Sequence, residues 1–341
     1  MNRSGRRSHL TALLTALIAC VSLLSLSTAP AWAKAGTITA FPPSTRLGGP
    51  DFITAGPDGN LWFTLAQVSQ IGRITTKGAI TAFPIPSTNS VPTGITAGPD
   101  GNFWFSDVNG NSIWRITTAG SFTEFPIPTA SSDPQGITAG PDGNLWFTED
   151  FGGNKIGRIT TGGSITEFPL PTNCGFSSGC GLEFITAGPD GNLWFTEASG
   201  NKIGRITPSG SIAEFPLPTA NSAPGGITTG PDGAIWFTEG LGNKIGRIAT
   251  EGFITEFRIP TTCGPNNCDP QGITAGPDGN LWFTEFGGNQ IGRMTLSGSF
   301  TFFPIPSFHS NPFDITAGPA HTSDLWFTEE NAGKIGRIST K

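Results

Sequence analysis

The chain repeats one sequence pattern seven times. Each copy reads close to Ile-Thr-Ala-Gly-Pro-Asp-Gly-Asn-Leu-Trp-Phe-Thr-Glu, followed by Ile-Gly-Arg-Ile and then by Ile-Thr-Glu-Phe-Pro. Successive copies are 42 to 48 residues apart, measured between Trp62, Trp104, Trp146, Trp194, Trp236, Trp282 and Trp326. A period in the forties with four short strand-like runs per copy is typical of a β-propeller blade. The pattern predicts an all-β fold, a seven-bladed β-propeller with four-stranded blades, and it places any functional site at an end of the central channel.

The third copy illustrates how the pattern predicts local structure. Its runs predict strands at 136–140, 145–149, 155–160 and 164–169. The intervening Pro141-Asp142-Gly143 is a tight-turn signal, because Pro presets φ and Gly supplies a positive φ. The second strand carries three consecutive large apolar residues, as expected for a strand covered on both faces. We therefore expect Trp146 and Phe147 to fill the layers between neighbouring blades.

Two long-range pairings follow from the pattern. If the turn at Gly162-Gly163 has two residues, Arg158 stands opposite Glu167 and the two form a cross-strand ion pair. The last copy stops after its third strand, at Lys341, while residues 36–42 match a fourth strand. We expect this N-terminal strand to complete the last blade, which removes open sheet edges.

Residues 1–33 are predicted to be a signal peptide, and residues 34–341 the propeller. Three arginines precede an apolar stretch from Leu10 to Leu26, and Ala31-Trp32-Ala33 is a suitable cleavage site. These features predict a secreted protein, extracellular or periplasmic. In the alternative, Leu17-Ile18-Ala19-Cys20 is the lipobox of a bacterial lipoprotein, and Cys20 carries a lipid anchor.

Charge and cysteine content limit the partners and the compartment. The net charge is −6, and loss of the three leader arginines makes it −9, which argues against nucleic acid or an anionic membrane as partner. No later stretch has about 20 apolar residues, so no transmembrane span is expected.

Cys174 and Cys180 form one close pair and Cys263 and Cys268 another; in an exported protein these predict two local disulfides rather than a metal site. A closed ring is expected to be a monomer.

The connectivity places two sets of residues at the end of the propeller with the longest loops, the usual location of function. One set ends the second strands: Leu65, Asp107, Glu149, Glu197, Glu239, Glu285 and Glu329. The other precedes the first strands: Asp51, Thr93, Gln135, Glu183, Gly225, Gln271 and Phe313. The second set varies although the surrounding pattern hardly does. We therefore interpret Asp51, Thr93, Gln135, Glu183 and Gln271 as ligand-binding candidates.

The acidic set admits two interpretations. A partial ring of acids near the channel mouth could hold a divalent cation through oxygen ligands. Alternatively, each carboxylate accepts hydrogen bonds from amides of its own loop.

The repeated text closely resembles that of the virginiamycin B lyase family over residues 36–341. The resemblance rests on Gly-Ile-Thr-x-Gly-Pro-Asp-Gly, on Trp-Phe-Thr-Glu and on Asn-Lys-Ile-Gly-Arg-Ile. It implies a seven-bladed propeller that opens a cyclic depsipeptide antibiotic, a type B streptogramin, by elimination with Mg²⁺. The family signature places histidine after the proline that precedes inner strands. None of the seven residues at this position of the chain is histidine.

Elimination requires a general base and a general acid, and histidine is the usual choice near neutral pH. Of three histidines, His9 is in the leader, His321 is in a turn at the opposite end, and His309 is in the connection into the last blade. The favoured hypothesis is an exported propeller that binds a small molecule or an extracellular protein or peptide at the loop-rich mouth.

Two enzymatic alternatives remain at this point. One is a C–O lyase that uses Mg²⁺ and the weak catalytic candidates, which are Glu149, Glu197, Glu239, Glu285 and His309. The other is a lactonase-type metal hydrolase with an Asn/Asp/Glu cage around Ca²⁺.

Overall fold

The computed structural model describes residues 34–42, 48–152, 154–172, 179–260, 263, 268–320 and 322–341. All of them belong to one compact unit that spans Ala33–Lys341. Residues 1–33, which include Cys20, and also Cys174 and His321, lie outside the described residues. No helix among the described residues is long and apolar enough to cross a membrane.

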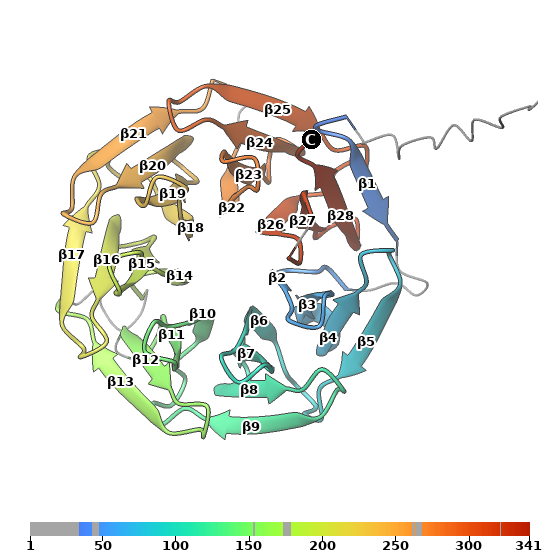
Figure 1. The fold of residues 1–341 in the computed structure, drawn as a ribbon. Coiled ribbons are helices and arrows are strands. Elements are labelled where there is room, and N and C mark those ends of the chain that lie inside the picture. Colours follow the sequence, from blue (N-terminus) through green and yellow to red (C-terminus); the bar gives the residue numbers. More distant parts are fainter. Residues whose placement is uncertain are drawn as a thin grey trace, which may run out of the picture. The chain divides into compact units, whose positions relative to one another are not determined.

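Within the described residues, 28 strands form seven four-stranded antiparallel sheets. Figure 1 shows the sheets arranged as blades around a central axis, each with its first strand innermost. The predicted all-β, seven-bladed propeller is confirmed. One short 3₁₀ turn, η1 (Ala66–Val68), interrupts the loop after the second strand of the first blade.

The strands recur with nearly constant bounds. The innermost strands are β2 (Ile53–Ala55), β6 (Pro92–Ala97), β10 (Pro134–Ala139), β14 (Leu182–Ala187), β18 (Pro224–Thr229), β22 (Pro270–Ala275) and β26 (Pro312–Ala317). The second strands are β3 (Leu61–Leu65), β7 (Phe103–Asp107), β11 (Leu145–Glu149), β15 (Leu193–Glu197), β19 (Ile235–Glu239), β23 (Leu281–Glu285) and β27 (Asp324–Glu329). The third strands are β4 (Gln70–Ile74), β8 (Ser112–Ile116), β12 (Lys155–Ile159), β16 (Lys202–Ile206), β20 (Lys244–Ile248), β24 (Gln290–Met294) and β28 (Lys334–Ser339). The outermost strands are β5 (Ile80–Pro84), β9 (Phe122–Pro126), β13 (Ile165–Pro169), β17 (Ile212–Pro216), β21 (Ile254–Arg258), β25 (Phe300–Pro304) and β1 (Ile38–Phe41).

The N-terminal strand closes the ring. β1 pairs with β28 in antiparallel register, with Ile38 opposite Ile338 and Phe41 opposite Ile335. Phe41 also stacks on Trp326 of the same blade at 5.3 Å between ring centroids. The predicted completion of the last blade is therefore confirmed, and the two ends of the propeller share one sheet (Figure 1).

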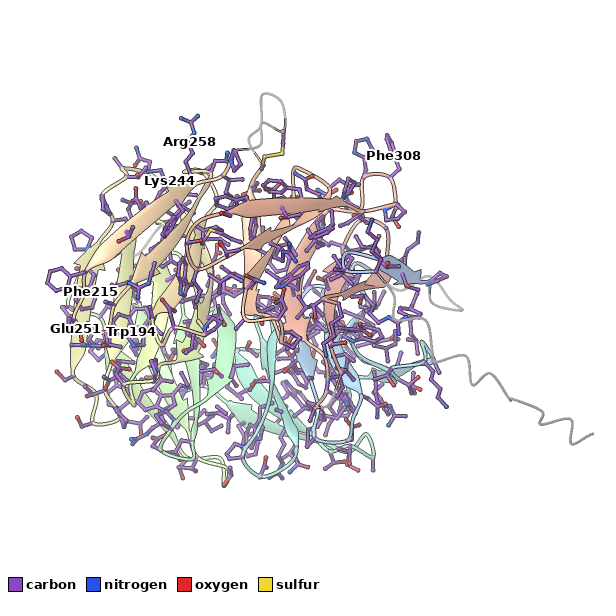
Figure 2. The ribbon with its side chains drawn as sticks, turned by 45° about the horizontal axis from the view of Figure 1, so that its top comes forward. Trp194, Phe215, Lys244, Glu251, Arg258 and Phe308 are labelled. Atoms are coloured by element: carbon purple, nitrogen blue, oxygen red, sulfur yellow. A yellow bond between two sulfur atoms is a disulfide. The ribbon has the colours of Figure 1, made fainter. Side chains whose placement is uncertain are left out.

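The core consists of layers between adjacent blades. Every residue of β11 is buried, and Trp146 packs against Leu182 and Leu193 of the next blade. The Trp indole is anchored because its Nε1–H donates to Asp142 of the Pro-Asp-Gly turn at 3.0 Å. Within each blade, the Trp ring also stacks on a Phe ring of the outermost strand, as Trp194 does on Phe215 with centroids 5.6 Å apart (Figure 2).

The predicted Arg158–Glu167 pair is wrong by one residue of register. Arg158 stands opposite Thr166, because the turn at Gly163 closes with a hydrogen bond from Gly163 N to Thr160 O. The Glu167 carboxylate instead pairs with Lys155 at 3.0 Å. The Arg158 guanidinium lies 5.6 Å from the Trp146 ring centroid, where a cation–π contact and aromatic packing replace the ion pair.

A β-bulge in each of six inner strands shapes the channel end. In β10 the register shifts between Pro134 and Ile137, which leaves Gln135 and Gly136 outside the regular ladder. A Cβ on Gly136 would overlap the backbone of Glu183 in the next blade, so glycine permits the inner strands to approach each other. Second-strand threonines bind the neighbouring bulge, as when Thr238 Oγ1 donates to Gln271 O at 2.7 Å. These hydrogen bonds hold the residue that precedes the bulge glycine, such as Gln271 before Gly272, beside the channel.

Candidate functional site

A small cavity lies among the bulged inner strands at the loop-rich channel mouth. Its volume is about 230 Å³, and it is lined by Phe52, Gln135, Asp150, Glu183, Phe184, Gln271 and Phe313. Four of these residues come from the variable set before the first strands. Phe52 and Phe184 occupy the next position, where four other blades have glycine, and Asp150 directly follows β11. The cavity therefore combines side chains from blades that are distant in sequence.

Three phenylalanines form an aromatic wall of this cavity. The centroid of Phe52 lies 5.3 Å from that of Phe184 and 5.3 Å from that of Phe313, with the second pair edge to face. Phe184 and Phe313 complete the trio at 6.2 Å. These residues belong to the first, fourth and seventh blades, so their mutual contact spans the channel. Sequence reasoning missed Phe52 and Phe184, although both replace the glycine found at the same position in other copies.

The two glutamines of the cavity are oriented by carboxylates. Gln135 Nε2 donates to Asp133 Oδ1 at 3.0 Å, and Gln271 Nε2 donates to Asp269 Oδ1 at 2.8 Å. Asp150 is held by backbone amides, since its Oδ1 accepts from Gly181 N at 2.7 Å and from Leu182 N at 2.9 Å. These contacts organise the polar side of the cavity before any ligand arrives.

The cavity and its surroundings are acidic. Glu183 is solvent-exposed within the channel, but the surrounding protein reduces its hydration, and together with Asp150 and Asp269 this raises its pKa to about 7. Burial, together with the Asp150 carboxylate, raises the pKa of Asp133, and burial raises the pKa of both Asp150 and Asp269. No lysine or arginine is among the lining residues. A cation would be favoured here, because it would stabilise the ionised form of these carboxyls.

Two further ligand-binding candidates lie outside the lining. Asp51 precedes Phe52, and burial followed by repulsion from Glu330 raises its pKa to about 7. Thr93 Oγ1 donates to Pro134 O at 3.0 Å and so joins two blades. Of the predicted ligand-binding residues, the structure brings Gln135, Glu183 and Gln271 together in the cavity.

The predicted ring of acids at the ends of the second strands does not form. Glu149, Glu197, Glu239 and Glu329 are completely buried inside their own blades, and their carboxyl oxygens have no hydrogen-bond partner in the described part of the chain. Burial, followed by repulsion from Glu167 of the outer strand, raises the pKa of Glu149 to about 8. The alternative of amide-bound carboxylates applies to Asp107, which accepts from Val91 N at 2.8 Å and from Gly110 N at 3.1 Å.

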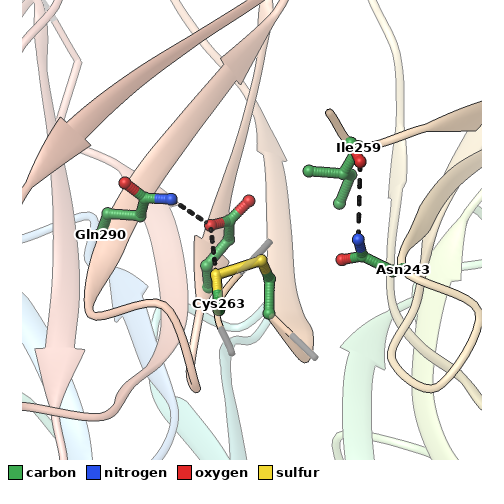
Figure 3. The surroundings of a disulfide bond; sticks show 6 residues. Asn243, Ile259, Cys263 and Gln290 are labelled. Atoms are coloured by element: carbon green, nitrogen blue, oxygen red, sulfur yellow. Dashed lines mark hydrogen bonds between the residues drawn. A yellow bond between two sulfur atoms is a disulfide. The ribbon is translucent and has the colours of Figure 1, made fainter. Parts of the chain in front are cut away.

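Glu285 lies beside a disulfide. Cys263 and Cys268 are bonded to each other, which confirms this predicted pair, and the Cys263 sulfur lies 3.8 Å from Glu285 Oε2 (Figure 3). Gln290 Nε2 donates to the same oxygen. Cys180 is also disulfide-bonded, while its predicted partner Cys174 lies outside the described residues.

His309 occupies an exposed turn. Its φ is 47°, like that of Ser131 and Asn221 at the same position of other blade connections, so it serves as a left-handed turn residue. Its neighbour Phe308 is 86% exposed and stands at the rim (Figure 2). His309 is not among the residues that line the cavity.

Among the described residues, the channel mouth has no set of three protein ligands for the Mg²⁺ that the family resemblance implies. Across these residues, the one group of three candidate ligands within 4.8 Å of one another consists of Cys263, Cys268 and Glu285. Its two sulfurs are consumed by the disulfide, and Mg²⁺ prefers oxygen ligands.

Two larger hollows lie between blades at the same end. One, of about 500 Å³, includes Gln67, Glu330 and Lys334. The other, of about 540 Å³, includes Val108, Ser131 and Phe151. Both are formed mainly by loops, whereas the channel-mouth cavity is built on strands whose positions are held by hydrogen bonds between blades.

Comparison with known proteins agrees with this architecture. The model of the virginiamycin B lyase family matches residues 30–175, 98–264 and 262–341. The chain belongs to this family. A streptogramin B lyase structure is 40% identical with a TM-score of 0.82, over 89% of this chain and 98% of that one. A comparison with curated proteins gave no match.

Two further solved structures are similar to this chain, one at high and one at low sequence identity. A catalytically inactive histidine-to-alanine variant of virginiamycin B lyase from Staphylococcus aureus, with quinupristin, is 42% identical, with a TM-score of 0.81 over 89% of this chain and 99% of that one. Hydrazine synthase from Kuenenia stuttgartiensis has a TM-score of 0.69 at 15% identity, over 87% of this chain and 97% of that one. The latter likeness is one of fold alone. In this family member, none of the residues at the position where the resemblance implies histidine is histidine; these residues are Asp51, Thr93, Gln135, Glu183, Gly225, Gln271 and Phe313.

Proposed function

We propose that this family member is an exported propeller that binds a small organic ligand in the channel-mouth cavity and does not carry out histidine-dependent elimination. The cavity carries the proposal: it joins two oriented glutamines, two carboxyls and three phenylalanines, and its lining contains no imidazole. Convergent polar groups beside aromatic side chains in a concave surface are a recurrent feature of small-molecule sites. The ligand is small, because about 230 Å³ falls below the roughly 300–1,000 Å³ of sites for drug-sized molecules.

The chemistry of the lining opposes the lyase alternative. A glutamine amide neither accepts a proton as a base nor donates one as an acid near neutral pH, so Gln135 and Gln271 cannot replace a catalytic histidine. Glu149 is buried inside its blade, and His309 is exposed in a turn. Neither reaches the cavity lining. No observation favours the lactonase alternative, because the described carboxylates form no cage for Ca²⁺.

The first experiment tests for elimination. The purified protein is incubated with quinupristin, with and without Mg²⁺, and mass spectrometry together with chromatography follows formation of a linear product of unchanged mass. We expect the cyclic form to persist. Accumulation of the linear product, beyond that in a protein-free control, would establish the lyase alternative.

The second experiment tests for binding. Ligand-observed NMR screens small soluble amines, alcohols and carboxylic acids against the protein. We expect hits that disappear in a Gln135→Ala/Gln271→Ala double variant and persist in the matched control Gln70→Ala, since Gln70 lies in β4 outside the cavity. A screen without any hit dependent on Gln135 and Gln271 would reject a small-molecule site here.

Export is part of the same proposal. The arginine-rich start, the apolar stretch and the Ala31-Trp32-Ala33 site support secretion, as does the Cys263–Cys268 disulfide, because such bonds persist in oxidising compartments. Intact-mass measurement of the mature protein tests it: an N-terminus near Lys34 is expected, whereas a lipid-modified N-terminus at Cys20 would indicate anchoring.

A further inference from the structure

The channel-mouth cavity combines an aromatic wall with an unusual excess of carboxyl groups. We propose that its ligand is an organic cation, an amine whose nitrogen carries methyl or other small alkyl groups, bound by the phenylalanine faces and by Glu183 and Asp150. This inference rests on the proposed function and specifies its ligand class.

The aromatic wall provides the first argument. Phe52, Phe184 and Phe313 contact one another across the channel and all line the cavity. Aromatic faces attract cations through their negative electrostatic potential, and alkylated ammonium groups suit them because their methyl groups are also apolar. Phe52 and Phe184 stand where four other blades have glycine, so these rings are additions to the repeat, and each also packs against a core cluster between blades.

The distribution of charge provides the second argument. Asp150 and Glu183 line the cavity, while Asp133 and Asp269 lie behind its two glutamines. Asp51 and Asp314 are the chain neighbours of Phe52 and Phe313.

Basic side chains are engaged elsewhere in the described part of the chain. Lys155, Lys202 and Lys244 pair with carboxylates of the outer strands. The seven arginines of the third strands lie over Trp rings of the second strands, as Arg73 does 5.6 Å from the Trp62 centroid. No basic side chain lines the cavity, so the negative potential at the channel mouth is left for a ligand to offset.

The spacing of the carboxyls distinguishes an organic cation from a metal ion. A divalent ion held by protein oxygens alone needs several of them in one coordination sphere, and no three candidate ligands of the cavity lie within 4.8 Å of one another among the described residues. A bulky alkylammonium ion has diffuse charge and needs only carboxylates at its periphery and aromatic faces against its methyl groups. The small volume of the cavity suits such a head group.

Binding should be linked to protonation. The pKa of Glu183 is about 7, raised by reduced hydration inside the channel and by the neighbouring Asp150 and Asp269. Asp133 faces Asp150 from the preceding loop, and burial raises its pKa as well. A bound cation stabilises the ionised carboxylates, so binding releases protons and the affinity rises as the pH increases through about 7.

Calorimetric titration with choline and with its neutral isostere, 3,3-dimethylbutan-1-ol, tests the proposal. We expect choline to bind about tenfold more tightly than the alcohol, in the range that a desolvated cation–π contact provides. Glu183→Gln and Phe184→Leu should each weaken choline binding about five- to tenfold. The matched controls are Glu251→Gln and Phe253→Leu, since Glu251 and the 76% exposed Phe253 lie in an outer turn. The wild-type protein alone provides a further readout: choline binding should release protons and be tighter at pH 8 than at pH 6.

The outcomes separate this inference from the proposed function. Equal affinity for choline and the alcohol, or binding of neutral compounds alone in the NMR screen, would refute a cation site and leave a small-molecule site in place. Displacement of choline by millimolar Mg²⁺ would assign the site to a metal ion instead. Absence of choline binding at every pH would refute the inference, and the screen would then decide the proposed function independently. Circular dichroism melts confirm that each variant is folded before its affinity is interpreted.

Discussion

Replacement of Glu149 by glutamine should stabilise the protein at alkaline pH and leave its stability at pH 5 almost unchanged. The Glu149 side chain is completely buried, its carboxyl oxygens have no hydrogen-bond partner within the described residues, and its pKa in the folded protein is about 8. The unfolded chain has the ordinary value of 4.5. Between these two values the unfolded state loses its proton first, so the folded state becomes less stable as the pH rises.

The size of this effect follows from the pKa difference. One pKa unit corresponds to about 1.36 kcal/mol, so a rise from 4.5 to about 8 costs on the order of 4 kcal/mol at pH 8 and above. Below pH 4.5 both states hold the proton and the cost is absent. Glutamine has nearly the same shape as protonated glutamate and does not ionise. The variant should therefore avoid most of this cost.

The assay is urea unfolding of wild type and Glu149→Gln from pH 5 to pH 8.5. The free-energy difference between them should be small at pH 5 and grow with pH in favour of the variant. Asp142→Asn is the matched control in the same blade, since Asp142 is not among the groups that shift the pKa of Glu149, and hydrogen bonds from Asn144 and Trp146 outweigh desolvation and lower the pKa of Asp142. That variant should lose stability at neutral pH. A difference for Glu149→Gln that stays constant across this pH range would refute the reasoning.

Three further predictions concern the scaffold. Deletion of residues 34–42 should lower the melting temperature of the whole propeller, because it exposes the edge of the last blade; a truncated protein that melts at the wild-type temperature would contradict the closure. Gly136→Ala should destabilise the protein by about 2 kcal/mol or more, because the added Cβ would overlap the backbone of the next blade, whereas Gly162→Ala, whose Cβ would make only an ordinary 3.7 Å contact with Thr160 Oγ1, should be neutral in chemical denaturation. Joint replacement of Cys263 and Cys268 by serine should cost about 2 kcal/mol in non-reducing denaturation, as expected for such a short loop, and an unchanged midpoint would show that the bond adds no stability.

The fold was predictable because its information is local and repeated. Pro141-Asp142-Gly143 specifies a turn by itself, and Trp146 and Phe147 specify a strand covered on both faces. Seven copies of these turn and strand signals predict seven similar four-stranded sheets, which pack face to face in a closed ring. Ring closure was also readable, since the fourth strand missing at Lys341 is present at residues 36–42.

Register was less predictable than strand identity. Whether Arg158 faces Glu167 or Thr166 depends on one residue in the turn, and both turns suit the local sequence. The three-dimensional contacts decide, because Lys155 reaches the Glu167 carboxylate while the guanidinium lies over the rings.

By itself, the sequence determined the number of blades, the strands within each and the set of positions that vary around the channel. Only the tertiary structure decided which variable residues meet: Gln135, Glu183 and Gln271 come together with Phe52 and Phe184, while Glu149 is enclosed within its own blade. The physical reason is that hairpin turns and strand pairing act over a few neighbouring residues, whereas the cavity brings together inner strands of different blades. Its members share no local pattern, and their proximity exists only once the ring has closed.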